Sequence, residues 1–517
     1  MSLDRALAAL PRAYPGPGGA VAVLRDGEVL ARHAWGWANA ERRIAFTPNT
    51  LFRMCSITKQ FTCAALLDAF PDPTVLDAAV RDRLPLLDRP APTILDLCHN
   101  QSGLRDYWAV AMLLGAPVES AFGDHEAVRL IGATRCLHFT PGTRFSYVNQ
   151  NFRILSDIAQ DRLGRDFAEI LRTRIFDRVG MDGAILAADT RAMPDGTEGY
   201  EGNPITGFRA AENRIVWTGD AGLGASLNDM IAWERYIDAT RDDAGSLYGR
   251  LSGPVTFADG SPAAYGFGLG RSMEFGRAVI GHGGALRGWR SHRLYVPAER
   301  ISVVVMFNHL SNAAAAALDV LAAILGETRP SPDRTLPTPA WTGSYIEPET
   351  GLSARVEAAD AGRVRLRFGH SAELLDLRAD GQAGGTTRLR FTDNSLWMDR
   401  RGENLSSPLR PADGSAAMDA AGRYRCAELD AELTVVDAGG VLYGAFSGFL
   451  GQGRMELLEP IGKDMWALPC PRALDHTPPG DWTLAFQRDD RGAIDGATVG
   501  CWLARGLSYR RVASGRL

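Results

Sequence analysis

The 517-residue sequence has no run of about 18 uninterrupted apolar residues, so it offers no candidate for a transmembrane helix. It has no excess of positive charge either, because 56 lysines and arginines stand against 61 aspartates and glutamates, a net charge of −5. We therefore expect neither nucleic acid nor a membrane surface as a partner. Apolar residues make up 45% and charged residues 23%, which is typical of a globular protein. At this length we expect about two to four domains.

Cysteines are few and widely spaced, and the seven of them show neither metal-ligand spacing nor a dense disulfide framework. The pair His125-Glu126 lacks the H-E-x-x-H spacing of a zinc site, and no nucleotide-binding loop occurs, so we expect no metal and no cofactor. The N-terminal stretch contains Asp4 and is interrupted by Pro11, which makes a poor secretion signal. Together with the scattered cysteines, this predicts a location in the reducing cytoplasm.

The first 330 residues mix strand-like and helix-like segments. Strand patterns lie at 19–38 and 265–309, near the two ends of this region, and helical patterns such as 151–176 lie between them. This order predicts one α+β domain over 1–330, in which strands from both ends join a single sheet.

The character of the sequence changes after a proline-rich stretch at 329–341, which we interpret as a linker. Strand-length runs dominate beyond it, and the alternation of Val364 and Leu366 with arginines is typical of a half-buried antiparallel strand. We predict two small antiparallel β-barrel domains, at 331–413 and 414–517, because closing a barrel removes exposed strand edges.

The strongest chemical signal is Ser56-Ile-Thr-Lys59, at the start of a helical pattern. A spacing of three residues puts the serine hydroxyl and the lysine amine on one helix face. A serine is a weak nucleophile until a nearby base takes its proton, and a lysine can act as that base when burial lowers its pKa. Taken alone, the motif favours a capping serine followed by a solvated lysine, whereas the mostly apolar residues 51–55 before it indicate a buried helix start.

Two further segments carry chemical groups that fit such a site. Tyr147-Val-Asn149 follows a Thr-Pro-Gly turn, and its phenol and amide can move or orient protons. His282 lies among glycines, which let a substrate approach the backbone closely. Each segment alone also fits a structural role, a buried tyrosine in a turn or a glycine-rich hairpin.

The order and spacing of these three motifs resemble those of the penicillin-recognising serine hydrolases, which include class C β-lactamases, D-alanyl carboxypeptidases, esterases and D-stereospecific peptidases. The resemblance covers about residues 15–325 and implies a β-lactamase-like α/β sandwich, an antiparallel sheet flanked by helices. Further stretches that match the family are Leu97–Leu104, Thr140–Asn149, Ile175–Met181 and Ala221–Ser226.

The resemblance implies a role for each matching residue. Ser56 corresponds to the nucleophile, Lys59 to its activating partner and Tyr147 to the proton shuttle. Asn149 corresponds to an amide that orients the substrate. The oxyanion hole would be formed by the backbone N–H groups of Ser56 and Ala285, with Gly283 and Gly284 beside them.

The third motif departs from much of the family, in which it begins with lysine rather than with His282. This change removes a permanent cation that would pair with a substrate carboxylate. We expect a neutral imidazole there, hydrogen-bonded to the phenol of Tyr147. A target that is recognised by its carboxylate, as penicillin is, is therefore disfavoured.

A three-domain layout with histidine in the third motif resembles the D-aminopeptidase branch of the family. The resemblance implies release of an N-terminal D-residue, such as D-alanine, from small peptides, amides or esters through an acyl-enzyme on Ser56. It also implies that a loop of the last domain, here 469–480, reaches the active site. We hypothesise that Asp475 in this loop binds the substrate ammonium. A solvated loop acid is the alternative.

Other activities remain open on the same site. An esterase, a D-amino acid amidase or a D-peptide endopeptidase would use the same residues, and a catalytically dead penicillin-binding sensor module is the non-enzyme alternative. An α/β-hydrolase is disfavoured because no G-x-S-x-G elbow occurs. Inhibition by β-lactams and assembly into a homodimer are further expectations.

Overall fold

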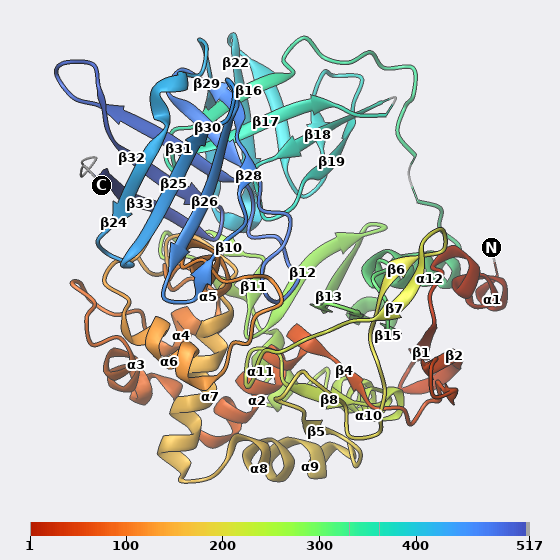
Figure 1. The fold of residues 1–517 in the computed structure, drawn as a ribbon. Coiled ribbons are helices and arrows are strands. Elements are labelled where there is room, and N and C mark those ends of the chain that lie inside the picture. The colour runs from red at the N-terminus through yellow and green to blue at the C-terminus, as the bar shows by residue number, and fades with distance from the viewer. Residues whose placement is uncertain (1, 330, 361, 513–517) are drawn as a thin grey trace.

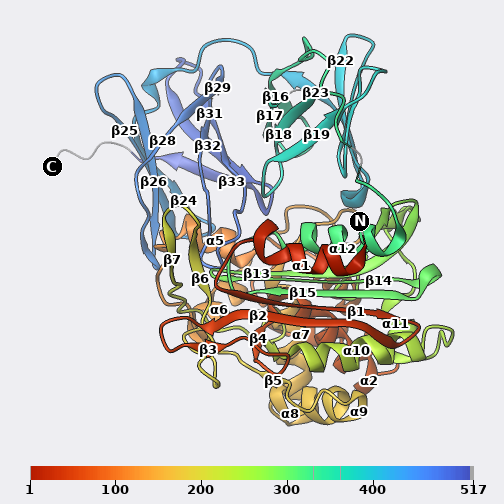
Figure 2. The same cartoon turned by 90° about the vertical axis from the view of Figure 1, so that its right-hand side faces the viewer.

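The structure is a computed structural model that describes residues 2–329, 331–360 and 362–512. Figure 1 shows a lower part that mixes helices and strands, with strands alone above it. The view turned by 90° separates the upper strands into two units that lie side by side on the lower part (Figure 2). The chain therefore consists of a mixed α+β domain and two β units.

The α+β domain is built around one eight-stranded antiparallel sheet in the order β11-β12-β13-β14-β15-β1-β2-β3. Its centre pairs β1 from the N-terminal end with β15 from the far end of the domain, with Val21 opposite Val305. The prediction of one sheet made from both ends is confirmed. The strands are β1 Gly18–Arg25, β2 Glu28–Asn39, β3 Ile44–Ala45, β11 Tyr265–Gly266, β12 Leu269–Glu274, β13 Arg277–Leu286, β14 Trp289–Val296 and β15 Ile301–Phe307.

Helices cover both faces of this sheet. On one face, α1 Leu3–Ala13 and α12 Ala313–Leu325 pack against apolar side chains of β1 and β15. The other face carries a larger helical layer. At its centre is α2, a helix in which almost every residue is buried. The two central strands are almost entirely apolar because both faces of the sheet are covered, the exceptions being Arg25 and Ser302. The helices of the second layer are α2 Thr58–Ala69, α3 Asp77–Arg83, α4 Ile94–Cys98, α5 Tyr107–Leu113, α6 Asp124–Gly132, α7 Asn149–Leu163, α8 Phe167–Leu171, α9 Asp177–Val179, α10 Leu227–Ala239 and α11 Leu247–Ser252.

Short strands connect these layers: β4 Phe52–Arg53, β5 Ile185–Leu186 and β8 Leu223–Ala225 form one small sheet, and β6 Tyr200–Asn203 pairs with β7 Gly207–Ala210. A further pair is β9 Val255–Thr256 with β10 Pro262–Ala263. Within the described ranges, no helix is both long and apolar enough to cross a membrane.

The first β unit is a closed barrel of eight antiparallel strands, as predicted for the segment after the linker. Val364 and Leu366 point into its core, and the arginines between them are more exposed. Its strands are β16 Gly343–Glu347, β17 Leu352–Ala358, β18 Arg363–Arg367, β19 Glu373–Leu377, β20 Ala383–Gly384, β21 Arg388–Thr392, β22 Ser395–Arg400 and β23 Leu405–Pro411.

The second β unit is a half-barrel, a ten-stranded antiparallel sheet that runs from β27 to β29 without closing on itself, whereas we predicted a second barrel. Its edge near β27 is covered by the α+β domain, where Leu450 N–H donates to the Leu114 carbonyl at 3.1 Å. Docking thus protects an edge that closure would otherwise remove. The strands are β24 Gly422–Cys426, β25 Ala431–Asp437, β26 Leu442–Gly448, β27 Gly451–Gln452, β28 Glu456–Leu457, β29 Glu459–Gly462, β30 Met465–Leu468, β31 Trp482–Arg488, β32 Ile494–Cys501 and β33 Ala504–Arg511.

Candidate active site

Ser56 lies in a single 3₁₀ turn, Cys55–Ile57, that leads directly into α2. Cys55 before it has φ +50°, a left-handed conformation that is costly for a residue with a side chain. Strand β13 passes so close that a Cβ on Gly284 would collide with the Met54 carbonyl oxygen. The Ser291 hydroxyl donates to the same carbonyl at 3.0 Å. Ser56 is therefore held on a tight turn that is fixed against the sheet.

Lys59 donates from its amine to three acceptors. They are the Ser56 hydroxyl at 3.1 Å, the Asn149 side-chain oxygen at 2.9 Å and the Asp220 carbonyl at 2.8 Å. The lysine side chain is completely buried, and burial lowers its pKa to about 8, against the opposing effect of Asp220 and Asp106. A lysine with this pKa can exchange a proton with the serine near neutral pH.

Tyr147 lines the same cavity as Ser56. The Lys59 amine is 4.9 Å from the centre of the Tyr147 ring. Burial raises the pKa of the Tyr147 phenol well above its usual value. The phenol therefore stays protonated in the resting protein and is placed to pass a proton on.

His282, on β13, has a different partner from the one we predicted. Its Nδ1 faces the Gly283 carbonyl at 2.5 Å, so Nδ1 must carry the proton. Its Nε2 then accepts from the Tyr265 hydroxyl at 3.2 Å. The ring of Tyr147 is 6.1 Å away, centre to centre. Burial, and next the Lys59 ammonium, lower the pKa of His282 to about 3, so the imidazole is neutral.

Tyr265 was missed because nothing in its short strand distinguishes it from a core tyrosine. It begins β11, next to β12 in the order of the sheet, and its ring packs against Phe145 with centres 5.3 Å apart. Its phenol orients the His282 imidazole, a contact that depends on the folding of β11 back onto the sheet.

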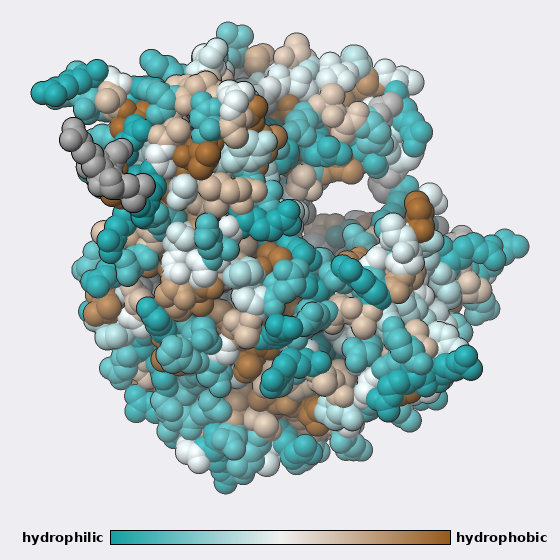
Figure 3. All heavy atoms as spheres, in the orientation of Figure 1, coloured by the Kyte–Doolittle hydropathy of each residue, from teal (hydrophilic) through white to brown (hydrophobic). Residues whose placement is uncertain are grey.

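A cavity of about 730 Å³ lies over Ser56 at the junction of all three parts of the chain. The α+β domain, the barrel and the half-barrel each contribute residues to its wall, and Figure 3 shows the surface hollowed between the upper β units and the lower domain. Residues from the sequence analysis that line it are Ser56, Tyr147, Asn149, His282, Gly283, Gly284, Ala285 and Asp475. The buried Lys59 amine donates to the Ser56 hydroxyl.

Asn149 is held at both ends of its side-chain amide. Its oxygen accepts from Lys59, and its NH₂ group donates to Asp106 at 3.0 Å. The backbone N–H of Asn149 donates to the same carboxylate oxygen at 2.6 Å. The amide thus links a buried acid to Lys59.

Asp106 is a second site residue that the sequence reasoning missed. It precedes α5, and its carboxylate caps that helix by accepting from the Trp108 N–H at 3.0 Å. From the sequence alone it is indistinguishable from an ordinary N-cap acid. In the structure it is fully buried and lines the cavity, and the half-barrel fixes its backbone, because the Asp106 N–H donates to the Leu503 carbonyl at 3.0 Å.

Asp475 comes from the loop between β30 and β31 and is 7% exposed. Its carboxylate accepts from the Thr477 N–H at 3.0 Å. Burial, and next the nearby Asp106 carboxylate, raise the pKa of Asp475 to about 7. Burial likewise raises the pKa of Asp106, to about 6. Two buried carboxylates therefore share one cavity. A cation bound between them would reduce the electrostatic cost of holding both as anions.

Aromatic side chains from the three parts of the chain form one wall of the cavity. Trp502 of the half-barrel lies between Phe145 and the barrel residue His370, with ring centres 6.3 and 5.7 Å away. The Trp502 indole N–H donates to the Glu403 carboxylate of the barrel at 2.9 Å. This wall makes the shape of the cavity depend on both β units.

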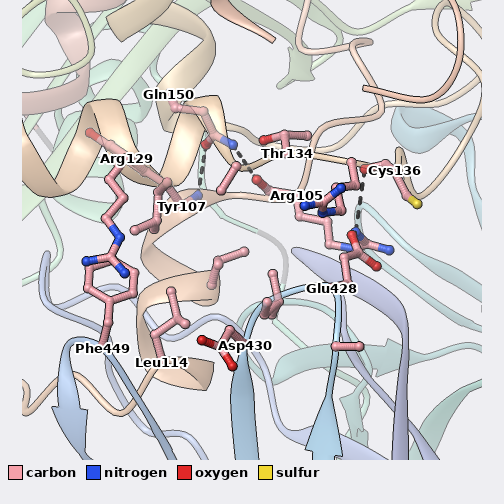
Figure 4. A pocket seen from close by; sticks show the side chains of 16 residues that line it. Arg105, Tyr107, Leu114, Arg129, Thr134, Cys136, Gln150, Glu428, Asp430 and Phe449 are labelled. Carbon is pink, nitrogen blue, oxygen red and sulfur yellow. Dashed lines mark hydrogen bonds and ion pairs between the residues drawn. The ribbon is translucent and has the colours of Figure 1, made fainter. Parts of the chain in front are cut away.

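A second, smaller cavity of about 240 Å³ lies behind this site, between α5, α6 and the half-barrel (Figure 4). Arg105 crosses this boundary and pairs with Glu428 at 2.5 Å, while its Nε donates to the Arg505 carbonyl at 2.9 Å. These contacts fasten the half-barrel next to Asp106. In the part of the chain that the structure describes, no group of three or more histidine, cysteine, aspartate or glutamate side chains is placed to hold a metal ion.

Comparison with known proteins gives two family matches along the chain. The model of the β-lactamase family matches residues 3–327, and that of D-aminopeptidase domain B matches residues 334–510.

Individual relatives match over the whole length. The chain is 61% identical to a D-aminopeptidase of Gluconobacter oxydans strain 621H over 99% of this chain and 98% of that protein. It is 48% identical to a D-aminopeptidase of Brucella canis over 99% of each. Among solved structures, the octameric penicillin-binding protein homologue from Pyrococcus abyssi is similar in fold, at a TM-score of 0.55 and 20% identity, over 79% of this chain and 99% of that one.

Proposed function

The chain belongs to the D-aminopeptidase family, whose larger part is a β-lactamase domain, and we propose that it removes an N-terminal D-amino acid from small peptides, amides or esters. It is a serine-type hydrolase. The observation that carries the choice of substrate is the pair of buried carboxylates, Asp475 and Asp106, in the cavity above Ser56.

Catalysis begins with attack of the Ser56 hydroxyl on the carbonyl carbon of the first residue. Lys59 in its neutral form takes the hydroxyl proton as the bond forms. The backbone N–H groups of Ser56 and Ala285 stabilise the oxyanion, each with a few kcal/mol. The departing amine receives its proton through Tyr147, which leaves an acyl-enzyme on Ser56. Water then releases the D-amino acid, with the same groups used in reverse.

The substrate ammonium is bound by Asp475, with Asp106 as the second carboxylate. A desolvated ammonium has three N–H donors to satisfy, and the Asp475 carboxylate, which accepts one N–H from Thr477, keeps acceptor sites for them. Two acids that repel one another gain a common counterion when it enters. Asn149 orients Lys59 through its side-chain oxygen and is anchored to Asp106 through its NH₂ group, and its remaining donor and acceptor capacity can serve the substrate in the cavity that it lines.

Asp475→Asn tests this assignment. The asparagine keeps an oxygen for the Thr477 N–H and removes the charge. We expect KM for D-alanine p-nitroanilide to rise at least about tenfold, the worth of one charged hydrogen bond. The turnover of p-nitrophenyl acetate, which has no ammonium, should stay within about twofold. Equal losses on both substrates would remove Asp475 from substrate recognition.

The proposal also covers the cellular location, the inhibition and the assembly of the enzyme. We place it in the cytoplasm, which is supported by seven cysteines that are all free thiols. We also predict that β-lactams acylate Ser56 and that the enzyme assembles into a homodimer.

A further inference from the structure

Two arginines of the barrel face each other on neighbouring strands. Arg355 on β17 and Arg367 on β18 are direct cross-strand partners in the antiparallel ladder. Like charges in this position destabilise a sheet. Arg355 is only 9% exposed, so water screens the repulsion poorly. Within the barrel, Glu357 on β17 lies 3.5 Å from Arg367, and the shorter contacts to the two arginines come from outside the barrel.

These shorter contacts come from the half-barrel. One carboxylate oxygen of Asp481 accepts from Arg355 at 2.6 Å and from Arg367 at 2.7 Å. Glu459 at the start of β29 also pairs with Arg355, and it lies 3.5 Å from Arg367. Asp481 therefore bridges the two guanidinium groups and joins the two β units.

Asp481 is also the end of the active-site loop, since it directly precedes β31. Gly480 before it has φ +98°, and a Cβ there would lie 3.0 Å from the Gly369 carbonyl on the barrel turn after β18. The other end of the loop is held by the α+β domain, where Arg472 pairs with Glu119 at 2.6 Å. Asp475 lies between these two attachments.

We propose that the barrel is a positioning element of the active site, in which Arg355 and Arg367 hold Asp481 and thereby keep Asp475 in the cavity. The inference rests on the proposed role of Asp475 in binding the ammonium. None of the groups assigned above to the attack on the carbonyl comes from the barrel. Release of Asp481 by the barrel should therefore affect substrate recognition rather than acylation. If the loop is attached at one end only, Asp475 can adopt many positions, and ammonium binding becomes weaker.

Asp481→Asn in the full-length enzyme is the central test. It removes the charge that bridges both arginines and leaves Glu459 as the half-barrel carboxylate beside them. KM for D-alanine p-nitroanilide should rise about tenfold, while kcat/KM for p-nitrophenyl acetate stays within about twofold. Asp481→Glu should recover most of the loss. In the triple variant Arg355→Gln/Arg367→Gln/Asp481→Asn, KM should equal that of the double arginine variant, because the residues act as one unit.

Hydrogen exchange of the loop gives a readout that is independent of substrate. Peptides that cover 472–480 should exchange faster in Asp481→Asn. Asp419→Asn is the matched control, because it removes a 2.7 Å ion pair with Arg488 at the opposite end of β31 and should leave both readouts unchanged. Unchanged exchange and KM in Asp481→Asn would overturn the proposal, as would equal loss on both substrates.

The two proposals can fail separately. Faster loop exchange in Asp481→Asn, together with an unchanged KM in Asp475→Asn, would support the barrel as the holder of the loop and would reject Asp475 as the ammonium site.

Discussion

The Asp106 carboxylate accepts two hydrogen bonds from Asn149, one from the backbone N–H at 2.6 Å and one from the side-chain amide at 3.0 Å. This contact fixes which end of the amide meets Lys59. The oxygen faces the ammonium and the NH₂ group faces the acid. The charge of Asp106 therefore acts on Lys59 through one intervening side chain.

Asp106→Asn should move the pH dependence of acylation to lower pH. Asp106 raises the pKa of Lys59 against the lowering effect of burial, so its loss lets that pKa fall below about 8. More of the lysine is then neutral at pH 7. On p-nitrophenyl acetate, the ascending limb of kcat/KM against pH should shift to lower pH by about half a unit to one unit.

The control for this shift is Asp68→Asn, which removes an acid that pairs with Arg174 and Arg178 away from the cavity. Its pH profile should match that of the unchanged enzyme. If the ascending limb of Asp106→Asn lies at the same pH as that of the unchanged enzyme, Asp106 does not control the pKa of Lys59.

Tyr265→Phe should lower kcat on every substrate without changing the pH dependence. The variant removes the hydroxyl that donates to His282 and leaves the ring packing intact. Loss of one neutral hydrogen bond of about 1 kcal/mol corresponds to about a fivefold drop in kcat. Steady-state kinetics on the anilide and the acetate would measure it. A new limb near pH 6 would contradict the neutral imidazole, whose pKa burial lowers to about 3.

The local part of the site could be predicted from the sequence. Ser56 and Lys59 are three residues apart on one helix turn, so their contact at 3.1 Å needs no knowledge of the rest of the fold. The sheet that joins β1 and β15 was equally accessible, because both strands are apolar and lie at the two ends of one domain.

The rest depends on contacts between distant segments. Asp106 has the sequence signature of a helix cap, and only the approach of α7 turns it into a partner of Asn149. His282 selects Tyr265 rather than Tyr147 because β11 folds beside its strand. The half-barrel stays open because its edge meets Leu114 of another domain. No periodicity within one segment carries this information.

Glu234→Gln should strongly destabilise the α+β domain. Glu234 and Arg293 form a two-point ion pair at 2.6 and 2.7 Å, and both side chains are fully buried. Removing one charge leaves the other buried without a counterion, which costs about 3–5 kcal/mol. Urea unfolding followed by tryptophan fluorescence would measure the loss.

The matched control for this pair is Asp189→Asn, which breaks an exposed pair with Arg191. It should change the free energy of unfolding by less than about 0.5 kcal/mol. Similar losses in the two variants would mean that the buried pair is not a special source of stability.

Asp475→Asn should make the ligand-free enzyme more stable at pH 8. The folded-state pKa of Asp475 is raised to about 7 from its ordinary 3.8, so the folded protein holds this proton more tightly than the unfolded chain. As pH rises from about 4 to 7, the unfolded chain loses the proton first and stability falls. Asparagine avoids this cost, so the gain in Tm should be largest at pH 8 and shrink towards pH 5. Asp419→Asn should show the opposite sign at pH 8, because Arg488 lowers the pKa of Asp419. A lower Tm for Asp475→Asn at pH 8 would show that the loop acid is already stabilised as an anion without substrate.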